Sequence, residues 1–118
     1  MTWIKINRKI LLFSFISVII SISVLSLLPP KSSLHLGSKD KISHFLAYFI
    51  LSSNAFLVWR ISRKSFWLIF ILILYGLLLE FFQNFVPGRD SNWLDAFANT
   101  TGVLLGFLII WLFSRIDK

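Results

Sequence analysis

Four long apolar runs, separated by short polar stretches, make up most of this chain. They cover residues 10–28, 42–59, 65–88 and 96–114 and hold very few charged side chains. Roughly 20 apolar residues allow a helix to cross the ~30 Å hydrocarbon core of a bilayer. The pattern therefore predicts four transmembrane helices, at about residues 10–28, 42–59, 65–85 and 93–113.

The polar stretches between the runs are too short to hold further domains. Pro29 and Pro30 end the first run, and Pro87 with Gly88 ends the third, because proline disrupts a helix. Short connections make consecutive helices antiparallel neighbours. The first run is longer than the ~7–15 apolar residues of a signal peptide, so we expect it to stay as an anchor. We predict one all-α domain over residues 1–118, a polytopic membrane protein built as an antiparallel bundle of four transmembrane helices.

Composition excludes an ordinary soluble domain. Apolar residues make up 57% of the 118 residues and charged residues only 14%, whereas a small soluble domain needs more polar surface. The net charge of +7 does not indicate nucleic-acid binding, because the basic residues flank the apolar runs and form no single stripe. Cysteine is absent, which leaves no disulfide or thiol chemistry. We expect membrane lipids as partners and no nucleic acid.

The distribution of basic residues predicts the orientation in the membrane. With both termini in the cytoplasm, eight of the twelve Lys and Arg residues lie on the inner face and four on the outer face. Cytoplasmic segments usually carry the excess of positive charge. We therefore predict a multi-pass protein of the cell membrane with both termini cytoplasmic.

Glu80 is the only charged side chain in the run from residue 65 to residue 88. A carboxylate inside a membrane is expensive unless it is paired or faces a wet cavity, so such a residue is by default a functional candidate. In an antiparallel bundle the second and fourth helices begin where the third helix ends, near Glu80. Further polar residues are predicted at that end, which the orientation above makes the outer face: His44, Gln83, Asn84, Arg89, Asp95 and Asn99.

Helical spacing predicts which faces point into the bundle. Glu80, Gln83 and Asn84 share one face of the third helix. On the fourth helix, Gly102 and Gly106 have the spacing that lets helices approach closely in lipid. They lie on the same stripe as Asp95 and Asn99. Two more stripes are expected to pack against neighbouring helices: His44, Tyr48, Ser52 and Ala55 on the second helix, and Ser14, Ser17 and Ser21 on the first.

The polar set resembles an anion site or an acid–base site. Arg89 can hold a phosphate or carboxylate through two parallel hydrogen bonds. His44 beside a carboxylate can shuttle protons near neutral pH, so His44 and Glu80 are candidate catalytic residues. No zinc-protease motif, nucleophile elbow or local metal-ligand spacing is present, and we predict no metal and no cofactor. Charges gathered at one face also disfavour a channel or transporter.

Three motifs follow one another in order along the chain. They are Asp40-Lys41-Ile42-Ser43-His44 through Phe49, Tyr75 through Gln83 with Glu80 inside, and Pro87-Gly88-Arg89 followed by Trp93-Leu94-Asp95, Ala98-Asn99-Thr100 and Gly102 to Gly106. Together they resemble the core of the VanZ-like family, over more than half of the chain. The resemblance implies a small bacterial integral membrane protein of a family named for a member linked to resistance to the glycopeptide antibiotic teicoplanin. It implies no particular reaction.

Three functions stay open at this point. The first is non-covalent binding, at the outer face, of an anionic lipid head group, a cell-envelope precursor or a lipoglycopeptide. The second is a membrane enzyme that acts on a lipid-linked substrate, with His44 or Glu80 as acid–base. The third is a structural partner subunit in which the polar set only fixes helix packing. In the first, Arg89 contacts the anion, Glu80, Asp95 and His44 form a hydrogen-bonded frame, and Gln83 and Asn99 orient the ligand.

Overall fold

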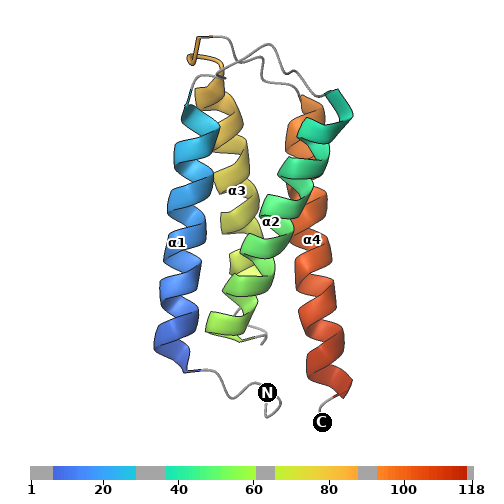
Figure 1. Cartoon of the computed structure of the whole chain (residues 1–118). Helices are drawn as coiled ribbons and strands as arrows, with labels where there is room; N and C mark the ends of the chain where they lie inside the picture. Colours follow the sequence, from blue (N-terminus) through green and yellow to red (C-terminus); the bar gives the residue numbers. More distant parts are fainter. Residues whose placement is uncertain (1–6, 29–36, 61–65, 88–92, 117–118) are drawn as a thin grey trace.

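The protein is a bundle of four antiparallel helices (Figure 1). The computed structural model describes residues 7–28, 37–60, 66–87 and 93–116, without the side chains of residues 37–41. The helices are α1 (Arg8–Leu27), α2 (Gly37–Trp59), α3 (Phe66–Gln83) and α4 (Trp93–Ile116). All four are long and apolar enough to cross a membrane. The described part of the chain contains no strand, as predicted.

The helix ends differ from the predicted ones by a few residues. α2 begins at Gly37, not at residue 42, and therefore includes Lys39, Asp40 and Lys41. Lysine is a good helix former, so a charged first turn can extend an apolar helix beyond the hydrocarbon. α4 continues to Ile116, while α3 already ends at Gln83 and is followed by turns.

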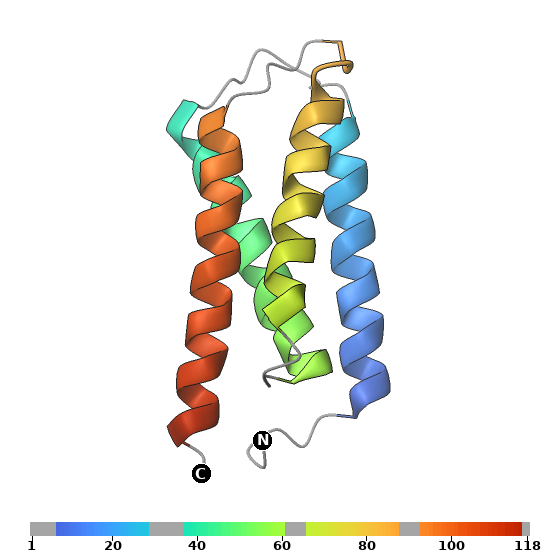
Figure 2. The same ribbon diagram turned by 180° about the vertical axis from the view of Figure 1, so that it is seen from behind.

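The closest helix pair is α2 and α4, which cross side by side in both views (Figure 2). Glycine allows this close approach, because a side chain would not fit between the helices. A Cβ at Gly102 would lie 2.5 Å from the Phe45 carbonyl oxygen, and one at Gly106 would lie 2.8 Å from the Ser52 Cβ. Ser52 is fully buried, and its hydroxyl donates to the Val103 carbonyl at 2.7 Å. The predicted packing stripes of α2 and α4 therefore face each other.

Polar contacts attach α1 to the rest of the bundle. The Tyr75 hydroxyl of α3 lies 2.7 Å from the Ser23 hydroxyl and donates to the Ile19 carbonyl at 3.1 Å. Lower on α1, the Asn54 amide of α2 donates to the Ser14 hydroxyl at 2.7 Å. The predicted serine seam is therefore only partly a packing surface, because Ser17 and Ser21 of the same stripe are exposed.

Tyr75→Phe should weaken the attachment of α1 to α3. The substitution removes the hydroxyl that contacts Ser23 and the Ile19 carbonyl but keeps the ring. Interhelical hydrogen bonds in membranes contribute about 0.6 kcal/mol on average and at most about 1.7. We expect a loss of about 0.6–1.7 kcal/mol in the free energy of unfolding, measured by titration with a denaturing detergent. Thr101→Ala is the control, because the exposed Thr101 hydroxyl bonds only within α4; an equal loss there would contradict the assignment.

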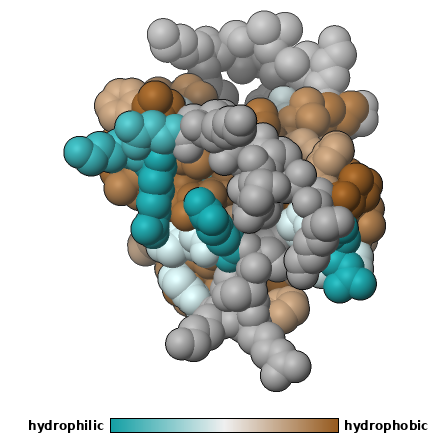
Figure 3. All heavy atoms as spheres, turned by 90° about the horizontal axis from the view of Figure 1, so that it is seen from below, coloured by the Kyte–Doolittle hydropathy of each residue, from teal (hydrophilic) through white to brown (hydrophobic). Residues whose placement is uncertain are grey.

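Described charged side chains are segregated between the two ends of the bundle. At one end, Arg8 and Lys9 begin α1, Arg60 follows α2 and Arg115 is in the last turn of α4 (Figure 1). The view from below shows hydrophilic residues on this end of the bundle (Figure 3). The described acidic side chains, Glu80 and Asp95, lie at the opposite end. The basic end is the one that the positive-inside bias assigns to the cytoplasm. The orientation itself stays a prediction.

Candidate functional site

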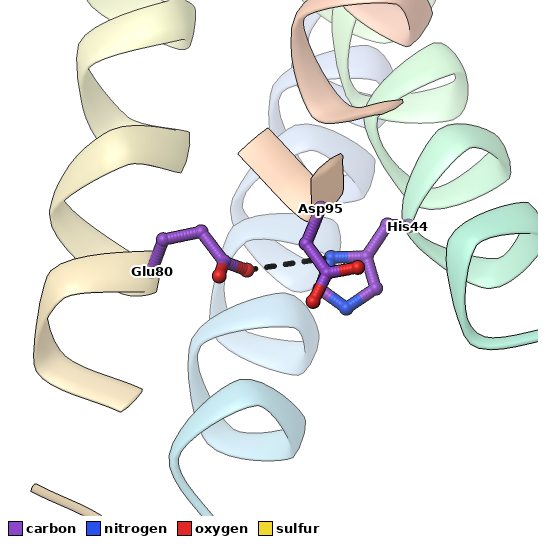
Figure 4. Close-up of side chains that lie close together, drawn as sticks. All are labelled: His44, Glu80 and Asp95. Carbon is purple, nitrogen blue, oxygen red and sulfur yellow. Dashed lines mark ion pairs between the residues drawn. The ribbon is translucent and has the colours of Figure 1, made fainter. Parts of the chain in front are cut away.

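Three ionisable side chains from three helices meet at the acidic end of the bundle (Figure 4). His44 comes from α2, Glu80 from the last turn of α3 and Asp95 from the first turn of α4. His44 Nδ1 lies 3.8 Å from Glu80 Oε1, and one ligand-type atom of each of the three residues lies within 4.8 Å of the other two. The antiparallel arrangement brings them together, because α2 and α4 start where α3 ends.

Both carboxylates of this site are buried. Glu80 is 7% exposed and Asp95 is 4% exposed. Removing a carboxylate from water costs several kcal/mol unless charges or hydrogen-bond donors compensate. His44 is one such group, since its ring lies next to both acids. The site is therefore held together by groups that depend on each other.

Asn99 orients the His44 ring. His44 Nδ1 lies 3.0 Å from Asn99 Oδ1. An amide oxygen carries no proton, so in this contact His44 Nδ1–H donates to Asn99 Oδ1. Gly76 of α3 makes room for Asn99, because a Cβ at Gly76 would lie 3.4 Å from the Asn99 Cβ. An imidazole ring fixed in this way suits acid–base work, anion binding and metal binding alike.

A pocket of about 250 Å³ opens beside the site, between α1, α2 and α3. His44, Ser43 and Gln83 give it polar groups, while Ile22 and Leu25 of α1 give it an apolar wall. The Gln83 amide donates to the Ser26 carbonyl at 3.0 Å and so holds α1 against α3 at the edge of the pocket. His44 thus contacts the buried acids on one side and the pocket on the other.

The structure brings several of the predicted site residues together. His44, Glu80, Asp95 and Asn99 meet, and Gln83 lines the adjacent pocket. Asn84 was predicted on the same face but is exposed, because α3 ends at Gln83 and the chain turns there. Arg89, predicted as the anion contact, lies outside the described residues. The sequence reasoning missed Ser26 and Ser43 as pocket residues and Gly76 as the residue that makes room for Asn99.

The donor set also has the composition of a metal site. One imidazole and two carboxylates are common ligands of zinc and of other divalent metals. The prediction of no metal rested on the absence of a local ligand spacing. That reason does not apply here, because the three donors come from three different helices. A divalent cation would be held by His44, Glu80 and Asp95 and would neutralise the two buried acids.

The fold and the site define a small multi-pass membrane protein with a buried His–carboxylate cluster at one end of its bundle. A family model described as VanZ/LLP1 matches residues 2–114, so the chain belongs to the VanZ/LLP1 family. The chain is also similar to the uncharacterized protein C11E3.10 of Schizosaccharomyces pombe (strain 972). The two are 31% identical over 111 residues, which is 92% of this chain and 67% of the yeast protein. No solved structure matches this chain.

Proposed function

We propose that this protein binds the anionic head group of a membrane amphiphile in the pocket beside His44. The proposal rests on one observation: His44 lines the pocket and also contacts Asn99 and Glu80 behind it. The His44 imidazole at the pocket wall would hydrogen-bond to a phosphate or carboxylate head group, and Glu80 and Asn99 hold the ring in place behind it. Ser43 and Gln83 supply further hydrogen-bonding groups at the pocket wall.

The walls of the pocket suit an amphiphile better than a small soluble ion. Ile22 and Leu25 lie opposite the polar groups, and the surrounding helices are membrane-spanning by length and composition. A head group at the membrane interface would therefore meet His44, with its chain left among apolar residues. Arg89 lies outside the described residues, and its role as the anion contact stays a prediction from the sequence. Membrane lipids are proposed as the ligand class, with a lipoglycopeptide or a cell-envelope precursor as a narrower case.

The test compares lipid retention by variants at His44. The protein is placed in nanodiscs with equal amounts of phosphatidylglycerol and phosphatidylcholine, and retained lipid is measured by native mass spectrometry. We expect preferential retention of phosphatidylglycerol, lowered about tenfold or more in His44→Gln, since a hydrogen bond to a charged group is worth about 1.5–3 kcal/mol. Glutamine keeps a donor for Asn99, so the fold should survive.

Thr101→Ala serves as the matched control, because Thr101 is exposed on α4, two residues from Asn99 but outside the site. It should retain phosphatidylglycerol as the original protein does. Equal retention of both lipids by the original protein, or an unchanged preference in His44→Gln, would refute the proposal.

The contact between His44 and Glu80 favours a second candidate function, hydrolysis of an ester in a lipid-linked substrate. His44 would take a proton from water as the water oxygen bonds to the acyl or phosphoryl centre. The ester bond to the lipid would then break, and the proton would pass to the leaving oxygen. Glu80, 3.8 Å from Nδ1, would stabilise the charged ring during this transfer. Incubation with ¹⁸O-labelled water distinguishes the two functions: an enzyme incorporates the label into a product, whereas a binding protein retains intact lipid.

A further inference from the structure

A second cavity continues the His44 pocket along the surface of the bundle. Its volume is about 310 Å³, and it lies between α1 and α2. Ser14, Ser17 and Ser21 of α1 and Ile50 of α2 are among its lining residues. Ile22 and Ala47 line both this cavity and the pocket beside His44. Because they share these residues, the two cavities adjoin; together they are here called the α1–α2 groove, which has one end at His44 and the other at Ser14.

The length of the α1–α2 groove matches one leaflet of a bilayer. Along α1 it runs from Ser14 to Ser26, which is about 18 Å at 1.5 Å per residue. Half of a ~30 Å hydrocarbon core is about 15 Å. The end at His44 would lie at the membrane interface and the other end near the bilayer midplane.

Small side chains and separated polar contacts keep the groove open. Ser17 and Ser21 are too small to fill the space between α1 and α2. Their hydroxyls can bond to carbonyls of their own helix, which leaves a largely apolar surface. α1 is attached on either side of this stretch: Asn54 holds Ser14, and Tyr75 holds Ser23.

We infer that the α1–α2 groove holds a single hydrocarbon chain of the amphiphile whose anionic head occupies the pocket beside His44. The inference rests on the proposed function and specifies its ligand: one linear chain joined to a phosphate or carboxylate head. A second helix packed on α1 does not fit these observations as well. A helix is 10–12 Å wide with its side chains and would cover the groove without entering the polar pocket.

The experiment uses hexadecyl phosphate that carries a photoactivatable diazirine in the middle of its chain. The full-length protein in phosphatidylcholine nanodiscs is irradiated with this probe, and the labelled residues are located by mass spectrometry. We expect labels on the residues that line the groove, which lie between residues 14 and 22 of α1 and include Ala47 and Ile50 of α2. Unlabelled dodecyl phosphate should compete for the site, whereas dodecanol, which has the chain but no charged head, should not.

Ser17→Phe fills the groove from an exposed position and should lower groove labelling at least about fivefold, a change that corresponds to roughly 1 kcal/mol. Ile20→Phe is the matched control, because Ile20 is exposed on α1 and lies outside the groove. Unchanged labelling in Ser17→Phe, or an equal loss in Ile20→Phe, would overturn the inference.

Two further outcomes separate this inference from the proposed function. If Ser17→Phe keeps the preference for phosphatidylglycerol and its labelling does not change, the head-group site stands and the groove assignment fails. If Ser17→Phe loses the label while His44→Gln keeps both the label and the lipid preference, the chain site stands and the head-group site fails.

Because the natural chain has no cysteine, Ser17→Cys also tests a second copy of the protein as occupant. If Ser17→Cys forms disulfide-linked dimers efficiently and these dimers exclude the probe, the occupant of the groove is a helix of a second copy, and the lipid assignment is wrong.

Discussion

Gly102→Ala is expected to lower the free energy of unfolding by about 1–3 kcal/mol, the usual cost of overpacking a well-packed contact. The added Cβ would lie 2.5 Å from the Phe45 carbonyl oxygen and 3.0 Å from the Phe49 backbone nitrogen. These are backbone atoms, so a side-chain rotation cannot relieve the clash, and α4 has to move away from α2. Gly102→Leu should prevent the two helices from packing at all.

The effect can be measured by detergent-induced unfolding, and the chain offers a graded control. At Gly76 an added Cβ would come only to 3.2 Å from the Tyr48 ring and 3.4 Å from the Asn99 Cβ, both side-chain atoms. Gly76→Ala should therefore cost less than Gly102→Ala. Displacing α4 also moves Asp95 and Asn99, so Gly102→Ala should lower phosphatidylglycerol retention as well. Stability equal to that of the original protein would show that α2 and α4 do not pack as described.

The apolar runs are sufficient to predict the four helices, because a membrane imposes a simple requirement on length and hydrophobicity. The helix ends are less predictable. The charged residues Lys39, Asp40 and Lys41 mark a polar stretch in the sequence, yet they continue α2. α3 ends at Gln83, earlier than predicted, and Asn84 is therefore exposed in the turn that follows the helix.

The candidate site could be predicted in part from helical spacing. Spacing places Asp95 and Asn99 on the glycine face of α4, and antiparallel order places them near Glu80. The contact between His44 and Asn99 needs the angle and depth of two helices, which spacing does not contain. The same limit applies to the stripe of Ser17 and Ser21: small residues indicate either close packing or a groove, and only the position of α2 decides between them.

Glu80→Gln is expected to separate function from folding. Glutamine has nearly the shape of glutamate but no charge, and Glu80 is 7% exposed and lies 3.8 Å from His44 Nδ1. Without the carboxylate, the His44 ring loses its neighbouring anion, and its contact with an anionic head group weakens. We expect phosphatidylglycerol retention to fall about tenfold or more. The free energy of unfolding should change by no more than about 1 kcal/mol, since glutamine keeps the shape and hydrogen-bonding groups of this side chain and Asp95 remains beside His44.

The opposite relation is expected if the polar set only holds helices together. In that case Glu80→Gln would lower stability and lipid retention in parallel, because each would report the same lost contact. Gly102→Ala provides the reference for such parallel loss, since it acts on packing. Glu80→Asp separates charge from position: it keeps the carboxylate but shortens the side chain. Partial recovery of lipid retention in Glu80→Asp compared with Glu80→Gln would assign the effect to the charge, and equal loss in both variants would assign it to geometry.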